Sequence, residues 1–168
     1  IDAITDIFRD YVKEALNGDA IHENQVRVKV MGRLDLLPTD IVQLVRSLEE
    51  ISMRYDKFFL NIAFAYGGRA EIVDAVKKIA SEVEVGKIKI EDIDEGKIER
   101  GLYTAHLPKS DADLIIRTSG EERLSNFLLW QSAYSELVFI DIFWPDFRKY
   151  DLWRAIRTYQ KRERHFGA

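Results

Sequence analysis

Short apolar segments alternate with amphipathic helical segments along the chain, and this alternation restricts the fold more than any other feature. Residues 26–30 alternate with a period of two, whereas residues 58–65 form a nearly continuous apolar run that is typical of a strand covered on both faces. Residues 113–117 and 137–140 are two further short apolar strands. Strands that alternate with helices form parallel sheets. The sequence therefore predicts an α/β fold with a mostly parallel central sheet and helices on both faces.

Four segments have the apolar spacing of three and four residues that is typical of helices. They cover residues 1–15, 38–51, 67–83 and 144–159, and a short helix is also predicted between residues 91 and 100. The apolar pattern of the first segment is already in place at Ile1 without a cap, so we expect this helix to begin before Ile1. We expect the last helix to begin at Trp144-Pro145-Asp146 and to turn four side chains inward: Leu152, Trp153, Ile156 and Tyr159.

Length and composition describe an ordinary globular domain. The chain has 168 residues and lacks a linker rich in proline, glycine or serine, so we expect residues 1–168 to form a single domain. The net charge of −4 argues against a protein that wraps nucleic acid, and the absence of cysteine excludes disulfides, cysteine-ligated zinc and a thiol nucleophile. No apolar run approaches the roughly 18 residues that a membrane span needs. We therefore expect a cytoplasmic protein without a nucleic-acid partner.

The segment that follows the third strand, residues 117–126, carries the groups that an anion site needs. It contains two arginines, three hydroxyl side chains and Gly120, which we expect to let backbone N–H groups approach a ligand. Arginine forks match phosphate oxygens in bidentate geometry. A phosphate or diphosphate site is one interpretation. The other, of equal weight on pattern alone, is a surface loop whose arginines pair with Glu121 and Glu122.

Two further positions could take part in such chemistry. Glu136 stands at the edge of the apolar strand 137–140, where it could hold Mg²⁺ or pair with an arginine; spacing alone favours the structural pairing. The turn Tyr66-Gly67-Gly68-Arg69 begins a helix, whose N-terminus favours anions, although a plain strand-to-helix connection is the simpler interpretation. The three histidines lack the spacing of metal ligands.

At residues 113–136 the pattern becomes specific. The string Arg117-Thr-Ser-Gly-Glu-Glu-Arg-Leu-Ser-Asn126 and the following Phe-Leu-Leu-Trp-Gln-Ser-Ala-Tyr-Ser-Glu136 closely resemble the signature of the cis-prenyltransferases. The resemblance extends upstream through residues 61–75 to His22 and downstream to Gly167, so it covers nearly the whole chain.

The resemblance implies a function. Members of the family condense isopentenyl diphosphate onto an allylic prenyl diphosphate, use Mg²⁺, make long-chain polyprenyl diphosphates and are usually homodimers. They are cytoplasmic enzymes that contact membranes through the lipid product. By resemblance, Arg117, Arg123, Leu124 and Ser125 bind isopentenyl diphosphate, and Glu136 is a metal ligand. Glu121, Gly68 and Arg69 are supporting residues of the same site.

Three departures from the family pattern bear on activity. The Asp-Gly-Asn-x-Arg-Trp motif, whose aspartate is the family's catalytic Mg²⁺ ligand, does not occur here, and we expect it to lie before Ile1. Ala65 replaces the asparagine that usually precedes Tyr-Gly-Gly-Arg, and His165 replaces an arginine of the tail. We therefore interpret the chain as about the C-terminal two-thirds of a catalytic domain, inactive by itself. The alternative is a non-catalytic, diphosphate-binding subunit of a heteromeric prenyltransferase; an unrelated phosphate-binding module carries little weight.

Overall fold

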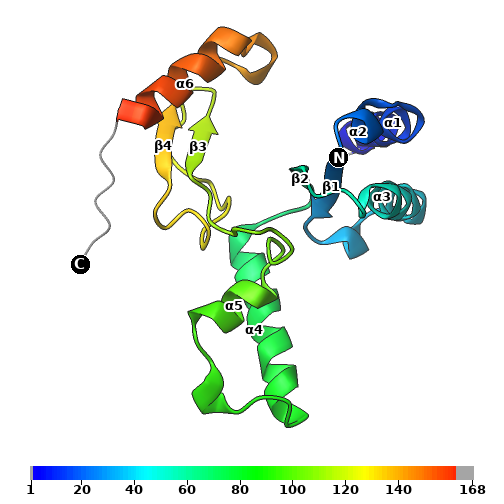
Figure 1. Ribbon diagram of the computed structural model, residues 1–168, viewed down its shortest axis with the longest axis vertical. Coiled ribbons are helices and arrows are strands. Elements are labelled where there is room, and N and C mark those ends of the chain that lie inside the picture. The colour runs from blue at the N-terminus through cyan, green and yellow to red at the C-terminus, as the bar shows by residue number, and fades with distance from the viewer. Residues whose placement is uncertain (1, 162–168) are drawn as a thin grey trace. The chain divides into compact units, whose positions relative to one another are not determined.

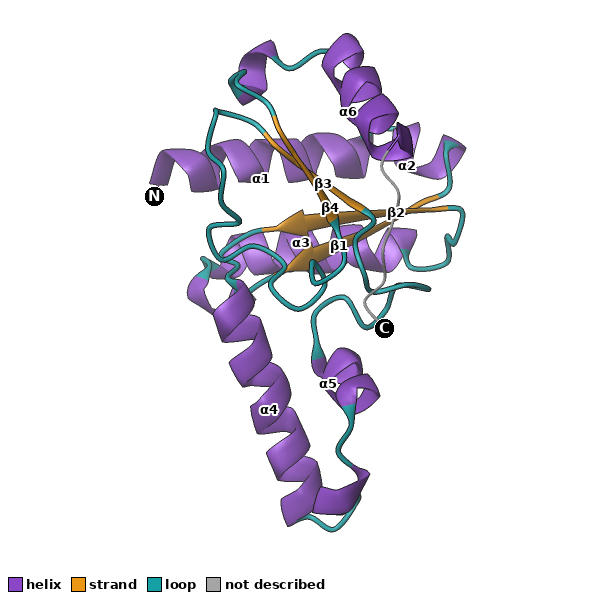
Figure 2. Cartoon of the chain, turned by 90° about the vertical axis from the view of Figure 1, so that its left-hand side faces the viewer, coloured by secondary structure: helices purple, strands orange, loops and turns teal. Residues whose placement is uncertain are grey.

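The computed structural model describes residues 2–161, which divide into two compact units at Tyr66–Gly67. Both units contain a pair of parallel strands with helices, so the predicted α/β class with parallel strands is confirmed (Figures 1 and 2). The described strands form two sheets of two strands each. The prediction that residues 1–168 form a single domain stays a prediction.

The first unit consists of one parallel strand pair and three helices. Helix α1 covers Asp2–Asn17, α2 Ala20–Glu23 and α3 Thr39–Ser52. Strand β1 (Val26–Met31) pairs with β2 (Phe58–Ala63), in a register that sets Val28 beside Leu60. A 3₁₀ turn at Leu34–Leu36 leads from β1 toward α3. Helices α1 and α3 contact each other, and α3 packs against β1.

The core of this unit is aliphatic and aromatic. Ile41, Val45 and Leu48, which follow the apolar helical spacing of segment 38–51, are at most 1% exposed. They cluster with five other buried residues: Phe8, Val12, Ile21, Val28 and Val30. The alternating apolar positions of β1 and the helical spacing of α3 therefore predicted this core correctly.

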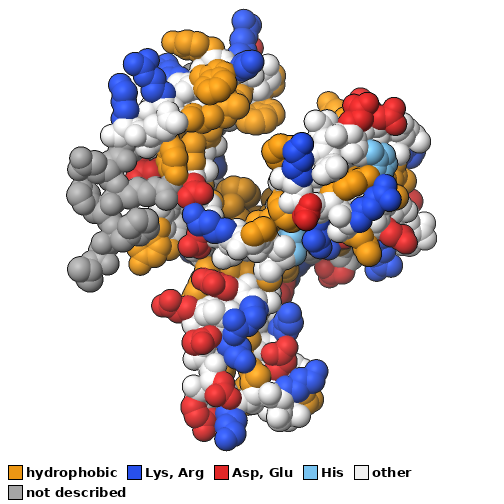
Figure 3. Space-filling model, in the orientation of Figure 1, with side chains coloured by type: hydrophobic (Ala, Val, Ile, Leu, Met, Phe, Trp, Pro, Cys, Tyr) orange, Lys and Arg blue, Asp and Glu red, His pale blue; other side chains and the backbone are white. Residues whose placement is uncertain are grey.

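The second unit is built on a long helix and a second strand pair. Helix α4 covers Gly68–Glu84 and packs against α5, which covers Glu95–Gly101, with a 3₁₀ turn at Ile90–Asp92 between them. Strand β3 (Leu114–Arg117) pairs in parallel with β4 (Glu136–Phe139), and α6 (Lys149–Lys161) contacts β4. In Figure 3 charged side chains of both signs cover the α4–α5 part of this unit, as expected of a solvated surface.

The interior of the second unit contains a polar cluster. Glu71 and Gln131 are each 1% exposed, and Thr104 is 3% exposed. One carboxylate oxygen of Glu71 accepts hydrogen bonds from the backbone N–H of Tyr103 (2.8 Å) and from Nε2 of Gln131 (3.0 Å). Nε2 of Gln131 also lies 3.0 Å from Oγ1 of Thr104. The hydrogen bonds join α4 to the segment between β3 and β4 and compensate for the burial of the Glu71 oxygen and of Nε2 of Gln131, whereas Oε1 of Gln131 is buried without a partner among the described residues.

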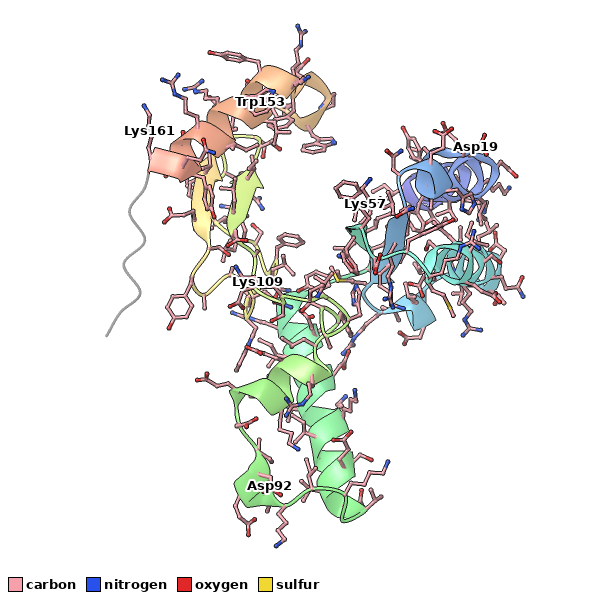
Figure 4. All side chains as sticks on the ribbon, in the orientation of Figure 1. Asp19, Lys57, Asp92, Lys109, Trp153 and Lys161 are labelled. Atoms are coloured by element: carbon pink, nitrogen blue, oxygen red, sulfur yellow. The ribbon has the colours of Figure 1, made fainter. Side chains whose placement is uncertain are left out.

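Several predicted inward-facing positions are wrong. Trp153 of α6 is 60% exposed and Leu152 is 40% exposed, whereas the buried residues of that helix are Asp151 and Ala155. Figure 4 labels Trp153 on α6. The helix begins at Lys149 and not at Trp144, because residues 144–146 form a separate 3₁₀ turn.

Strand β2 and helix α1 show the same limit of prediction from apolar spacing. Strand β2 is not covered on both faces, since Phe58 and Leu60 are about half exposed at 53% and 48%. On α1, Ile4 and Tyr11 are exposed, while Phe8 and Val12 of the same predicted face are buried. Apolar spacing predicts a face, but the neighbouring elements decide how wide a stripe of it they cover. None of the described helices is long and apolar enough to cross a membrane.

Candidate functional site

Arg117 ends strand β3 at its carboxyl edge, which is where ligands bind in parallel α/β sheets. It lines a cavity of about 310 Å³ together with six residues of β3 and the following loop: Ile115, Ile116, Thr118, Ser119, Leu124 and Phe127. The Nε atom of Arg117 is buried and has no hydrogen-bond partner among the described residues. A buried guanidinium N–H without an acceptor is costly, and an anionic ligand would supply that acceptor.

The backbone of the loop does not contribute donors at its glycine. The N–H of Ser119 donates to the carbonyl oxygen of Ile142 (2.8 Å), and the N–H of Gly120 donates to that of Ile140 (3.2 Å). The N–H groups of Ser119 and Gly120 are therefore used within the chain, and for the other N–H groups of the loop the prediction stays a prediction. Glycine suits position 120 for another reason: φ is +69°, and a Cβ atom at this position would lie 2.8 Å from Oδ1 of Asp141. The two backbone N–H groups of Ser119 and Gly120 are therefore not donors to an anion.

Arg123, the second arginine of the loop, forms an ion pair with Glu121, with 2.6 Å between Nη2 and Oε2. Both side chains are open to solvent, at 70% and 40% exposure. Exposed pairs of this kind contribute little to stability, about 0–1 kcal/mol. The structure thus contains the surface pairing that sequence analysis left open for Glu121. Such a pair is weak enough for a dianion to displace the carboxylate.

Ser125 and Asn126 carry the end of the loop to the first turn of α4. Both residues have left-handed backbone, with φ of +46° and +66°. The carbonyl oxygen of Asn126 accepts from the N–H of Gly68 (2.7 Å), and its side-chain Oδ1 accepts from the N–H of Arg69 (2.9 Å). The α4 N-terminus is therefore occupied by the chain itself. Gly68 and Arg69 lie beside the loop because of these contacts.

Glu136 lies at the other end of the strand pair. It begins β4 and is in register with Leu114, whereas Arg117 is in register with Phe139. These two register positions lie three residues apart along the strands, which corresponds to a distance of about 10 Å. The backbone N–H of Glu136 donates to the carbonyl oxygen of Asp113 (3.1 Å), and the residue is partly buried. The structure therefore brings Arg117 and Leu124 to one cavity and sets Glu136 at a different edge.

Within residues 2–161, no group of three or more histidine or acidic side chains could enclose a metal ion. Nδ1 of His22 lies 2.7 Å from the hydroxyl of Tyr55, and Nδ1 of His106 lies 3.1 Å from the carbonyl oxygen of Tyr103. Nδ1 of each of these histidines therefore has a partner within the chain. His165 lies outside the described residues.

Asn126, Glu71 and Gln131 have structural roles that the sequence did not predict. All three sit in segments that resemble the family signature, but no spacing rule links residue 126 to residues 67–69 or residue 131 to residue 71. One local signal was present for Asn126, because asparagine is enriched among residues with positive φ. The partners of these side chains follow only from the tertiary structure.

Comparison with known proteins decides which family has this loop and fold. The sequence matches the family described as "Putative undecaprenyl diphosphate synthase" over residues 1–167. The chain belongs to this family, the cis-prenyltransferases. The resemblance noted in residues 113–136 is thereby confirmed.

Curated cis-prenyltransferases of archaea are similar to nearly the whole chain. The sequence is 53% identical over 167 residues to the tritrans,polycis-undecaprenyl-diphosphate synthase (geranylgeranyl-diphosphate specific) of Methanocaldococcus jannaschii, covering 99% of this chain and 60% of that protein. It is 54% identical over 155 residues to the enzyme of the same class from Sulfolobus acidocaldarius, covering 92% and 58%. The chain thus spans about three-fifths of the length of these relatives.

Solved structures agree in fold. The crystal structure of lavandulyl diphosphate synthase from Lavandula x intermedia, in complex with dimethylallyl diphosphate, matches with a TM-score of 0.94 and 34% identity, over 99% of this chain and 71% of that one. A probable undecaprenyl diphosphate synthase from Campylobacter jejuni matches with a TM-score of 0.84 and 32% identity, over 99% and 74%. The cis-prenyltransferase fold predicted from sequence is confirmed.

Proposed function

We propose that this chain forms the isopentenyl diphosphate site of a cis-prenyltransferase, which extends an allylic prenyl diphosphate to a long-chain polyprenyl diphosphate. The names of the archaeal relatives specify geranylgeranyl diphosphate, and we propose the same allylic primer here. Arg117, Arg123 and Ser125 hold the diphosphate in this proposal, and Leu124 borders its site. The enzyme is a cytoplasmic homodimer that meets membranes through its lipid product.

The observation that carries the proposal is the buried Nε of Arg117, which lacks a hydrogen-bond partner among the described residues. Its position at the carboxyl edge of β3, in the wall of a cavity of about 310 Å³, is suited to a small anionic ligand. A guanidinium can contact two diphosphate oxygens at once. Arg123 joins the site when its exposed ion pair with Glu121 opens, so Glu121 and the diphosphate compete for Arg123 in this proposal.

The residues of this chain act by binding and orientation. Two guanidinium groups and the Ser125 hydroxyl fix the diphosphate of isopentenyl diphosphate, which directs its double bond at the carbon that loses the allylic diphosphate. Fixing two reactants in one geometry can supply much of the catalytic effect. The bond between the two isoprenoid units forms as the allylic diphosphate leaves, and loss of a proton then gives the cis double bond.

In this proposal the cofactor is Mg²⁺, and this chain supplies one carboxylate ligand to it. Mg²⁺ is usually held by one or two carboxylates together with substrate phosphates and water. Glu136 offers one partly buried carboxylate at the start of β4, at the end of the strand pair opposite to Arg117, so an ion that it would hold is not held against the loop around Arg117. When bound, Mg²⁺ would neutralise diphosphate charge. We expect Glu136→Gln to raise the Mg²⁺ concentration needed for half-maximal activity without lowering the melting temperature. A lower melting temperature with an unchanged Mg²⁺ requirement would assign Glu136 a structural role instead.

Residues 1–168 contain no Asp-Gly-Asn sequence, the motif whose aspartate is the family's catalytic Mg²⁺ ligand. Its absence bears on the reaction of the allylic substrate. We propose that residues 1–168 alone bind isopentenyl diphosphate but do not elongate a prenyl chain. A second candidate function rests on the same fact: a non-catalytic, diphosphate-binding subunit whose partner supplies the missing motif. Turnover by the protein that contains this chain in full, without a second polypeptide, would exclude this candidate.

The test compares Michaelis constants for the two substrates in the full-length protein. Arg117→Ala and Arg123→Ala should each raise the KM for isopentenyl diphosphate about 10- to 100-fold, because each removes charge-assisted hydrogen bonds. The KM for the allylic diphosphate should change much less. Lysine at either position should rescue only in part, since an ammonium group cannot make the bidentate contact.

Arg100→Ala is the matched control, since Arg100 is an exposed arginine of the same unit that lies outside the loop. It should leave both Michaelis constants unchanged. Equal losses for both substrates in the loop variants, or a loss for the allylic substrate alone, would mean that the loop binds the other diphosphate.

A further inference from the structure

The loop that carries Arg117, Arg123 and Ser125 is attached to the first turn of α4 by Asn126. Two hydrogen bonds make the attachment: Gly68 N–H to the carbonyl oxygen of Asn126 (2.7 Å), and Arg69 N–H to its Oδ1 (2.9 Å). Asn126 directly follows Ser125, so its position sets that of the serine hydroxyl. The two residues also share left-handed backbone, which leaves little freedom once Asn126 is held.

The surroundings of Asn126 are closely fitted to glycines of the α4 turn. A Cβ atom on Gly67 would lie 2.7 Å from Nδ2 of Asn126, and within 4 Å it would meet only atoms of that side chain. A Cβ atom on Gly68 would lie 2.9 Å from Cγ of Leu129. The loop and the turn therefore approach each other at a distance that only glycine allows.

Helix α4 is a firm support for this attachment. Glu71, in its first turn, accepts hydrogen bonds from Gln131 and from the Tyr103 backbone inside the unit. Gln131 belongs to the same segment as Asn126, so this segment is bound to α4 at two places. The N–H groups of Gly68 and Arg69 are already used by Asn126, so these two donors at the α4 N-terminus hold the loop and not an anion.

We propose that Asn126 is a positioning residue for the diphosphate loop, which it holds against the α4 turn Gly67–Arg69 so that Ser125 and Arg123 meet one diphosphate. This inference rests on the proposed function of the loop. It assigns Gly67 and Gly68 a role as well: they permit the close approach on which the attachment depends.

The first measurement determines the KM for each substrate in the full-length enzyme that carries Asn126→Gly. This substitution removes the side-chain hydrogen bond and keeps the positive φ accessible. The KM for isopentenyl diphosphate should rise about three- to tenfold, in line with one lost hydrogen bond. The KM for the allylic diphosphate should stay within about twofold of the parent value.

The matched control is Asp94→Ala. Asp94 also caps a helix with a side-chain oxygen, since its Oδ1 accepts from the N–H of Lys97 (2.7 Å) at the start of α5. This variant removes the same kind of bond in the same unit, away from the loop. It should lower the melting temperature as much as Asn126→Gly and leave both Michaelis constants unchanged.

A double-mutant cycle tests the contact itself. Gly67 has extended backbone, with φ of −159°, so alanine can adopt its conformation and acts only through Asn126. Gly67→Ala should raise the KM for isopentenyl diphosphate about threefold in the parent and have no further effect in the Asn126→Gly background.

The outcomes separate this inference from the proposed function. If Arg117→Ala and Arg123→Ala raise the KM for isopentenyl diphosphate while Asn126→Gly lowers only the melting temperature, Asn126 is a structural cap and the inference fails alone. Multiplicative effects of Gly67→Ala and Asn126→Gly would also overturn it. If the arginine variants leave that KM unchanged, the proposed function of the loop fails.

Discussion

The unit of residues 2–66 buries aliphatic side chains, whereas the unit of residues 67–161 buries a carboxylate and an amide. Ile41 and Val45 are fully buried in the first, and Glu71 and Gln131 are 1% exposed in the second. Aliphatic packing is non-directional, while a buried carboxylate must find donors in fixed places. The second unit also buries aliphatic residues such as Leu102, but its buried carboxylate and amide additionally hold particular segments in particular positions. The proposed diphosphate loop belongs to the second.

The largest effect should come from the aliphatic core of the first unit. Leu48 is 1% exposed and packs in the cluster shared by α1, β1 and α3. Leu48→Ala should lower the free energy of unfolding by about 2–5 kcal/mol, because it leaves a cavity that the neighbours fill only in part. Urea denaturation measures the loss. The KM for isopentenyl diphosphate should not change at temperatures where the variant is folded; a rise would contradict the division of roles.

A smaller loss of stability, with an effect on the site, is expected in the second unit. Glu71→Leu removes the acceptor for the N–H of Tyr103 and for Nε2 of Gln131. We expect a loss of about 1–3 kcal/mol, the usual consequence of leaving buried donors unsatisfied.

Glu71→Gln is the matched variant, since its amide oxygen can still accept both bonds. It should recover most of the stability in the same urea experiment. Because Gln131 and Asn126 lie in one segment, Glu71→Leu should also raise the KM for isopentenyl diphosphate. An unchanged KM would show that the buried polar cluster serves stability alone.

The smallest effect concerns an exposed ion pair of the first unit. Nε of Arg9 on α1 donates to Oδ2 of Asp40 on α3 (2.8 Å), and this hydrogen bond lowers the pKa of Asp40 below its usual range. A carboxylate with a lowered pKa stabilises the fold above the pKa of the unfolded chain, about 3.9, and this contribution is lost as the pH falls through the folded pKa.

Asp40→Asn should therefore lower the unfolding midpoint slightly at pH 7, and the difference from the parent should shrink below about pH 3.9. High salt should reduce it too, because both groups are open to solvent. Thermal melts at pH 7 and pH 3, with and without salt, measure this. A difference that grows on acidification would contradict the assignment of the pair.

The sequence by itself determined the α/β class, the buried face of α3, the parallel strands and the family, because these depend on local periodicity and on one contiguous motif. It also placed Arg117 at the end of a strand. It did not determine which apolar residues are covered: Trp153 and Leu60 are exposed although their spacing predicts burial. That coverage depends on the surface that a neighbouring element presents, which periodicity does not contain.

The tertiary structure alone decided how the loop is held. Asn126 meets residues 67–69, and Gln131 meets Glu71, which lies 60 residues away along the chain. It also decided that the N–H of Gly120 is occupied and that Glu136 and Arg117 stand at opposite ends of a strand pair. Ala65 is a further case: its φ of +50° lies in the region where asparagine, the family's usual residue there, is tolerated better than alanine. Each of these features is a contact or a backbone angle that depends on the tertiary fold. The order of residue types along the chain does not show which distant residues come together in space.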